Sequence, residues 1–240
     1  MGGELIRICT ICARGGSKGL PGKNLRPIAG KSLLTHTIDH AREVDLFDAI
    51  AVSSDSDEIL DAARTAGADF AVRRPDSMAT DTASKLPAIQ HAVATVEAET
   101  GKIFDIVVDL DVTAPLRIAE DILGAVRLCE ETGAANVLTA APARKNPYFN
   151  LIERQPDGTV TLSKTLPGPR IERRQDSPEC FDCNAAVYVW RRDIFMENAN
   201  VFYDDTQLYV MPPERSHDID TPLDFDFVEF LLARERGVAK

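Results

Sequence analysis

The chain has 240 residues, of which 44% are hydrophobic and 27% are charged, and its formal net charge is −11 at pH 7. This length and composition predict one large α/β domain, or such a domain with a small subdomain. The acidic balance excludes a typical nucleic-acid-binding protein, which needs broad positive potential. No apolar run reaches the length of a membrane span and residues 1–4 do not resemble a signal peptide, so we expect a cytoplasmic protein.

The first predicted strand, residues 6–11, leads into a glycine-rich turn at residues 12–24. Its glycines leave the backbone free to approach a ligand closely, because they have no Cβ. Against the acidic balance of the whole chain, every charged side chain from position 14 to position 31 is basic: Arg14, Lys18, Lys23, Arg26 and Lys31. Amide groups and cations together suit a polyanion such as a nucleotide triphosphate, and the alternative is a solvated basic loop.

This turn matches neither of two common nucleotide-binding motifs. Its glycines at positions 16, 19 and 22 recur every third residue, which is not the G-x-G-x-x-G pattern. Residues 30–32 resemble the end of a P-loop, but Leu25 stands where that motif needs its first glycine. The hydroxyl-rich residues 80–84, which precede a long helix, are a second candidate anion contact or simply a helix cap.

Strands and helices alternate through the first 141 residues. Strands are predicted at residues 6–11, 49–53, 68–72, 106–110 and 136–141. Helices are predicted at residues 32–44, 58–66, 85–99 and 119–131. Asp57 is the expected N-cap of the second helix and Gly67 its C-terminal stop. The alternation predicts a mostly parallel sheet with helices on both faces and with ligands at the carboxyl ends of its strands.

Residues 142–183 depart from this pattern. They are rich in proline, arginine and turns, and short strands near 151–153 and 159–162 flank Asp157 and Gly158 as in a hairpin. Apolar residues still alternate, so we expect a protruding subdomain rather than a linker. The core, residues 1–141 and 184–240, would resume with strands at 184–190 and 203–211 and end in a helix at 223–234.

Five cysteines include two C-x-x-C pairs, Cys9/Cys12 and Cys180/Cys183. The separation of the two pairs far exceeds the roughly 15–20 residues of a zinc ribbon. Cys9 and Cys12 also lie in or beside a predicted buried strand, where a free cysteine acts as a small hydrophobic residue. The pattern therefore favours free thiols over a zinc site.

Asp218 and Asp220 flank Ile219 just before the last predicted helix. In an extended segment both carboxylates point to one face. Such a pair, with no cation beside it in the sequence, suits a hard divalent cation such as Mg²⁺. Capping of the helix by Asp220 or Thr221 is the alternative, and it accounts for only one carboxylate. Together with the basic turn, the pair indicates nucleotidyl or phosphoryl transfer.

Five segments carry a family likeness: residues 13–24, residues 74–75 with 80–84, residues 113–117, residues 184–188 and residues 218–221. In this order, and over nearly the whole chain, they resemble the sialic acid (acylneuraminate) cytidylyltransferases, the CMP-sugar synthetases. The combination is far more specific than any one of the motifs.

The resemblance implies a three-layer α/β/α, nucleotide-diphospho-sugar transferase-like (Rossmann-like) fold with a mostly parallel sheet. It also implies dependence on Mg²⁺ and CTP as the donor. The acceptor would be a 2-keto-3-deoxy nonulosonic acid, whose anomeric hydroxyl attacks the α-phosphate and expels pyrophosphate. Residues 142–183 would build a homodimer and reach the sugar pocket of the partner.

The resemblance also assigns roles to individual residues. Lys23 would lie nearest the α-phosphate, Arg14 would assist it, and Asp220 would help to deprotonate the sugar hydroxyl. The nucleotide would contact Ala13, Arg14, Gly15, Ser17, Lys18, Lys23, Asn24, Arg74, Thr82, Ala83 and Ser84. The sugar would contact Asp111, Phe149, Arg174, Asn184 and Ala185. The metal would bind Asp218 and Asp220, with Asp111 as a further candidate.

Three residues depart from the sialate pattern at positions that face the sugar. Asp111 stands in place of a glutamine, Phe149 in place of a lysine of some members, and Ala185 in place of a glycine. These changes favour a relative such as legionaminate, pseudaminate or Kdn over N-acetylneuraminate. The alternatives are an octulosonate cytidylyltransferase, a phosphosugar uridylyltransferase, or an inactive nucleotide-binding scaffold of the same fold. Joint retention of phosphate-binding and metal-binding residues argues against the scaffold.

Overall fold

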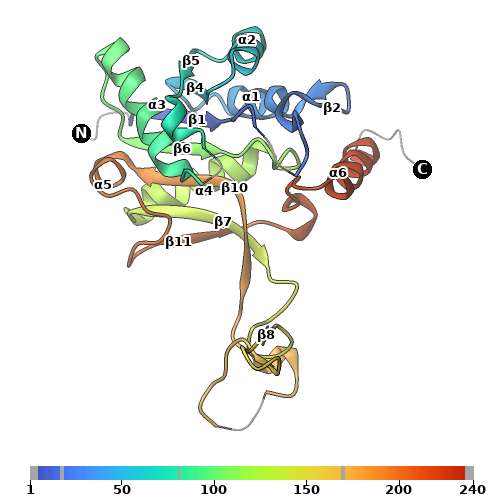
Figure 1. The fold of residues 1–240 in the computed structure, drawn as a ribbon. Helices are drawn as coiled ribbons and strands as arrows, with labels where there is room; N and C mark the ends of the chain where they lie inside the picture. The colour runs from blue at the N-terminus through green and yellow to red at the C-terminus, as the bar shows by residue number, and fades with distance from the viewer. Residues whose placement is uncertain (1–4, 17–18, 81, 169–170, 236–240) are drawn as a thin grey trace.

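A seven-stranded sheet forms the middle layer of the structure (Figure 1). From edge to edge its strands are β11 (Gln207–Val210), β7 (Asn136–Pro142), β10 (Phe181–Arg191), β6 (Ile106–Leu110), β1 (Arg7–Cys12), β4 (Ala49–Ser54) and β5 (Phe70–Arg73). β10 runs antiparallel to both of its neighbours, and the other neighbouring strands pair in parallel. The computed structural model describes residues 5–16, 19–80, 82–168 and 171–235. The predicted α/β fold with a mostly parallel sheet is confirmed.

Helices cover both faces of the sheet. One face carries α1 (Leu33–Glu43), α2 (Asp57–Ala66), α4 (Ala119–Thr132) and α6 (Pro222–Glu235), and the other carries α3 (Lys85–Thr100) and α5 (Arg192–Glu197). Neighbouring residues of a strand point to opposite faces. On β6, Val108 therefore packs into the core beneath α1 and α4, and Val107 packs with Trp190 and Phe195 beneath α3. Within the described residues no helix is both long and apolar enough to cross a membrane.

The N-terminus of α2 differs from the sequence prediction. Ser56, not Asp57, is the N-cap, since the Ile59 amide donates to Ser56 Oγ at 3.4 Å. Asp57 is instead the first helical residue and forms an ion pair with Arg73 at 2.6 Å. Gly67 ends the helix with a left-handed φ of 88°, as predicted.

The other differences between the predicted and the observed elements concern short helices and strands. The pair β2 (Pro27–Ile28) and β3 (Lys31–Ser32) and the helix α5 were not predicted, because elements of so few residues carry little periodicity. The strand expected at 203–211 is shorter, and β11 begins only at Gln207. The residues before it form a turn in which the Tyr203 amide donates to Thr206 Oγ1 at 2.6 Å.

Residues 143–168 and 171–180, which we call the arm, project from one end of the sheet (Figure 1). β7 and β10 lead into and out of it and pair from Phe181 with Pro142 to Cys183 with Ala140. The arm contains the antiparallel hairpin of β8 (Ile152–Arg154) and β9 (Val160–Leu162). β10 has an irregular register between Cys183 and Tyr188, where the strand passes from the arm into the core.

His40 of α1 is a partly buried titratable group. Its Nδ1 is buried without a hydrogen-bond partner among the described residues. Burial, together with the guanidinium of Arg117, lowers the pKa of His40 to about 3. The folded chain therefore favours the neutral imidazole.

This burial predicts acid sensitivity. Because unfolded histidine titrates near pH 6.5, the unfolded chain binds a proton that the folded chain excludes between about pH 6.5 and 3. We expect the free energy of unfolding to fall over this range, with about 2 kcal/mol lost at His40 by pH 5. Denaturant unfolding at pH 7 and pH 5 measures the loss. His40→Leu should remove that part of it, and an identical pH dependence in the variant would contradict the prediction.

Candidate active site

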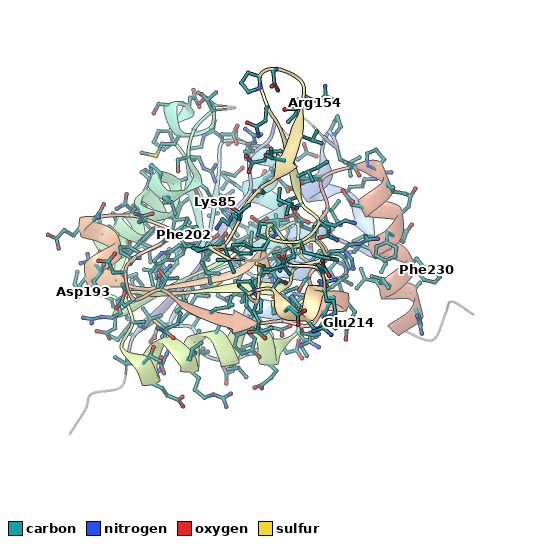
Figure 2. All side chains as sticks on the ribbon, turned by 90° about the horizontal axis from the view of Figure 1, so that it is seen from below. Lys85, Arg154, Asp193, Phe202, Glu214 and Phe230 are labelled. Carbon is teal, nitrogen blue, oxygen red and sulfur yellow. The ribbon has the colours of Figure 1, made fainter. Side chains whose placement is uncertain are left out.

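A cleft of about 460 Å³ opens at the carboxyl ends of β1 and β6. Residues predicted from the sequence line much of it: Arg14, Lys23, Asn24, Arg74, Ala83, Ser84, Asp111, Ala185, Asp218 and Asp220. The lining also includes residues to which the family resemblance assigned no individual role: Cys12, Gly19, Met78, Thr80, Lys85, Val112 and Thr113. In Figure 2, Lys85 lies near the middle of the view, whereas Arg154 of the arm lies at its upper edge.

The glycine-rich turn packs directly against the segment that carries the late carboxylates. A Cβ on Gly19 would lie 2.2 Å from the carbonyl oxygen of Asp220, so only glycine permits this approach. Lys23 Nζ donates to the Ile219 carbonyl at 2.8 Å and to Asp220 Oδ1 at 3.0 Å. The Ile219 amide donates to the Thr113 carbonyl at 2.9 Å. These contacts bring the turn, residues 218–220 and the segment after β6 to one place.

The beginning of the turn is fixed on the neighbouring strand β4. The Ala13 amide donates to the Ser53 carbonyl at 3.0 Å, and the Gly15 amide donates to Asp55 Oδ1 at 2.9 Å. Neither Ala13 nor Gly15 is among the residues that line the cleft. Asn24 Nδ2 donates to the Arg14 carbonyl at 2.9 Å and closes the turn. Ser17 and Lys18, which were predicted to bind the nucleotide, lie outside the described residues.

Asp218 and Asp220 differ from the expected pair in one respect. Asp220 already has a cation beside it, since Lys23 from the distant turn lies 3.0 Å away. The sequence could not show this contact, and the expectation of an uncompensated pair was wrong for Asp220. Partial burial and the charge of Asp220 raise the pKa of the Asp218 carboxyl.

The cap of α6 is formed by Thr221, one of the two residues considered as caps from the sequence, together with Asp224. The Thr221 amide donates to Asp224 Oδ2 at 2.7 Å, and the Asp224 amide donates to Thr221 Oγ1 at 3.3 Å. This reciprocal arrangement is a capping box. The side chains of Asp218 and Asp220 are therefore not used to cap the helix.

Lys85 joins two carboxylates at the floor of the cleft. It is the first residue of α3, and its Nζ lies 2.6 Å from Asp109 Oδ2 and 2.9 Å from Asp111 Oδ2. Burial alone would lower the pKa of Lys85, but the two carboxylates outweigh it and raise the pKa above its ordinary value. Burial works to raise the pKa of Asp111, yet Lys85 and Thr113 hold it well below its usual range.

One sequence signal could have revealed this network. Asp109 is the only charged residue in an otherwise apolar strand, and a buried charge needs a partner. Asp109 is fully buried, and Thr10 Oγ1 donates to its Oδ1 at 2.9 Å. The identity of the cation was not predictable, because Lys85 belongs to another element, α3, and meets Asp109 only through the packing of the fold.

The side chains of Arg74 and Ser84 both form hydrogen bonds with other groups of the protein. The buried Arg74 guanidinium donates from Nη2 to the Ser53 carbonyl at 2.9 Å and from Nε to Ser53 Oγ at 3.2 Å. Ser84 Oγ accepts from the Leu86 amide at 3.4 Å and caps α3. Thr82 is exposed and is not among the lining residues.

The predicted sugar-binding residues fall into three groups. Asp111 and Ala185 line the cleft, and Ala185 has a left-handed φ of 53°, which is unusual for a residue with a Cβ. Asn184 is buried, where its Oδ1 accepts from Thr139 Oγ1 at 2.7 Å. Phe149 and Arg174 lie in the arm, outside the lining of the cleft of their own chain.

Arg174 lines a second cavity, at the base of the arm. Asn146 and Cys180 share this cavity, and the Arg174 guanidinium donates to the Ala143 carbonyl. Within one chain, the structure therefore separates Arg174 from the cleft.

The family model for cytidylyltransferases matches residues 8–228. The chain belongs to the cytidylyltransferase family. It is 42% identical over 226 residues to CMP-N,N'-diacetyllegionaminic acid synthase of Campylobacter jejuni, with 94% of each chain covered. It is 41% identical over 233 residues to post-translational flagellin modification protein B of Campylobacter coli, with 97% of each covered. The family resemblance drawn from the sequence motifs is confirmed, and the chain is a nucleotidyltransferase.

A solved structure supports the fold. CMP:2-keto-3-deoxy-manno-octonic acid synthetase complexed with CTP superposes with a TM-score of 0.71 at 17% identity, over 96% of this chain and 99% of that chain. At this identity the likeness concerns the fold alone. The cleft thus lies on a fold that this synthetase also has.

The contact at Gly19 predicts a sharp difference between two glycines of the turn. Gly19→Ala should lower kcat/KM for nucleotidyl transfer by about 100-fold or more, because the new Cβ must push the turn away from Asp220. Gly16→Ala is the matched control, since no atom lies within 4 Å of its added Cβ. Pyrophosphate release from both variants is the measurement. Equal activities would show that the turn does not need this close approach.

Proposed function

We propose that this cytidylyltransferase joins CTP to a nonulosonic acid and releases pyrophosphate, so that the product is the CMP-sugar. One observation carries the proposal: Lys23 of the basic turn pairs with the Asp220 carboxylate, and Gly19 of the same turn packs against the Asp220 carbonyl. Cations for a triphosphate and oxygen ligands for a divalent metal therefore meet in one cleft. The name and the 42% identity of the Campylobacter jejuni relative support the sugar class.

In this proposal the chain binds and polarises the donor. Arg14 and Lys23 hold the triphosphate, and Lys23 stabilises the charge that develops on the α-phosphate. The remaining predicted nucleotide contacts stay part of the proposal, including Ser17 and Lys18. Asp220 accepts the proton of the anomeric hydroxyl, which is a poor nucleophile until it is deprotonated.

The residues present fit Mg²⁺. Mg²⁺ is usually held by one or two carboxylates together with phosphate oxygens of the substrate, and Asp218 and Asp220 supply such a pair. The pKa of Asp218 is raised by burial and by Asp220, so a cation between them would relieve their repulsion. Bound there, Mg²⁺ would neutralise phosphate charge and activate an oxygen nucleophile. Asp111 is the further candidate ligand, and like Asp220 it is paired with a lysine, Lys85, at 2.9 Å.

We further propose an acceptor of the legionaminate type. Ala185 places a methyl group in the cleft lining at a position that is glycine in the sialate pattern, which changes the shape of the pocket. The relatives at 41–42% identity include a legionaminate-activating enzyme. An octulosonate acceptor has weaker support, because the octonate enzyme shares only 17% identity.

A substrate panel tests the proposal. With CTP and Mg²⁺, we expect the highest kcat/KM for N,N'-diacetyllegionaminate, ahead of pseudaminate, N-acetylneuraminate, Kdn and 3-deoxy-octulosonate.

Lys23→Met should lower kcat by about 100-fold to 1,000-fold, because it removes a charge beside the reacting phosphate. Lys31→Met is the control, since Lys31 pairs with Asp39 on an exposed surface. Turnover of N-acetylneuraminate alone, or full activity of Lys23→Met, would contradict these assignments.

We also propose that the arm pairs two copies into a homodimer. The hairpin exposes apolar side chains that a lone chain would leave in water: Leu151 is 44% exposed, Ile152 59% and Val160 57%. Phe149 and Arg174 lie away from their own cleft and would be placed to serve that of the partner. The proposed domain division, with residues 142–183 as the dimerisation subdomain, follows from this role.

Sedimentation equilibrium tests the homodimer. The unmodified chain should sediment at twice its monomer mass, and the double variant Ile152→Asp/Val160→Asp should sediment as a monomer with reduced turnover. Ile103→Asp is the matched control, because Ile103 is 60% exposed outside the arm and should leave the dimer intact. A monomeric unmodified chain with full activity would overturn the proposed assembly.

A further inference from the structure

Asn184 is a buried polar residue that is not among the residues lining the cleft. β10 changes register between Cys183 and Tyr188, and the left-handed backbone of Ala185 falls within this irregular stretch. A strand irregularity beside a site can turn a side chain toward a new neighbour. Here the side chain of Asn184 is turned toward β7 and toward the segment that precedes α6.

All four hydrogen-bonding positions of the Asn184 amide are occupied by the protein. Its Oδ1 accepts from Thr139 Oγ1 at 2.7 Å and from the Ala186 amide at 3.1 Å. Its Nδ2 donates to Ser216 Oγ at 3.0 Å and to Met211 Sδ at 3.3 Å. A side-chain amide has two acceptor and two donor positions, so Asn184 has none left for a ligand.

Through Ser216, Asn184 holds the segment that carries the late carboxylates. Ser216 stands two residues before Asp218, and its hydroxyl also donates to the carbonyl at position 212 at 3.0 Å. On the other side of Asp218, the Ile219 amide is bonded to the Thr113 carbonyl at 2.9 Å. Asp218 is thus fixed by a hydrogen bond on each side of it along the chain.

Asp218 depends on this backbone support more than Asp220 does. Lys23 pairs with Asp220 at 3.0 Å, whereas within the described part of the chain no cation pairs with Asp218. A ligand of a metal ion keeps its working geometry only where surrounding residues hold it. The hydrogen bond between Asn184 and Ser216 supplies this support from the side of β10.

We propose that Asn184 is a positioning residue, which holds Asp218 through Ser216 for the divalent cation and does not touch the acceptor. This inference rests on the proposed function, because the cation belongs to that reaction. It replaces the contact with the sugar that the family resemblance implied for Asn184. Of the two neighbours Asn184 and Ala185, only Ala185 then faces the acceptor.

Binding of Mn²⁺ to the protein with CTP, in the absence of an acceptor, tests this inference. Mn²⁺ accepts the same oxygen ligands as Mg²⁺, and its EPR signal measures the free ion without turnover. In Ser216→Ala, the Kd for Mn²⁺ should rise about tenfold, because Asn184 loses its hold on the segment. Ser216→Thr keeps a hydroxyl and should bind Mn²⁺ more tightly than Ser216→Ala.

Thr65→Ala is the matched control, since it removes a hydroxyl that donates to the Asp61 carbonyl at 2.9 Å on the exposed side of α2. This variant should bind Mn²⁺ as the unmodified chain does.

Asn184→Ala should weaken Mn²⁺ binding by a factor similar to that of Ser216→Ala, although it also leaves the buried Thr139 hydroxyl without this partner and risks unfolding. The double variant should bind no worse than either single variant, because the two residues act as one unit. In kinetic assays the Mg²⁺ concentration for half-maximal rate should rise, with less than about a threefold change in the KM for the acceptor.

An unchanged Kd for Mn²⁺ in Ser216→Ala, or additive losses in the double variant, would overturn the inference alone. A raised acceptor KM confined to Asn184→Ala would overturn it in favour of a direct contact with the sugar. Failure of the unmodified chain with CTP to bind Mn²⁺ would overturn the proposed metal site and this inference together.

Discussion

The close approach of Gly19 to the Asp220 carbonyl is the constraint on which the cleft depends. A basic turn and an acidic segment lie almost at opposite ends of the chain, and both line the cleft. Because Gly19 has no side chain, the two backbones can touch. Lys23 then joins them by donating hydrogen bonds to the Ile219 carbonyl and the Asp220 carboxylate. The charge of each segment is partly balanced by the other before any ligand arrives.

The sheet supports this contact from below. Ile219 is fully buried, and its amide is bonded to the Thr113 carbonyl beyond the end of β6. Arg117, which is 1% exposed, donates to the carbonyls of Asp111 and Ala186 at 2.7 and 2.9 Å and so joins the ends of β6 and β10. A rigid floor of this kind keeps catalytic side chains close to their working geometry.

Much of the fold was predictable because the chain alternates strands and helices with clear periodicity. The buried strands such as β4 and β6, and the glycine that ends α2, carry local signals that tertiary packing does not override. The exact N-cap of α2 was not predictable, since Ser56 and Asp57 are adjacent and both are good caps. α5 was missed because it has six residues, too few to show a helical period.

The candidate site likewise contains residues that the sequence could reveal and residues that only the folded structure reveals. Arg14, Lys23, Asp218 and Asp220 belong to motifs, and their chemistry can be inferred from residue type. Lys85 belongs to no motif, and its role arises only when α3 packs beside β6 and brings it to Asp109 and Asp111. The pairing of Lys23 with Asp220 is likewise a product of folding, since 197 positions separate the two residues.

The backbone at Ala185 has a consequence for how substrate preference can change. A left-handed φ of 53° costs a residue with a Cβ about 1–2 kcal/mol that glycine would not incur. The methyl group in the cleft lining is thus kept against the conformational preference of its own backbone. Folding stability and the shape of the cleft are opposed at this position, since glycine would relieve the backbone and widen the cleft. Under the proposed function, the narrower cleft is retained for its acceptor.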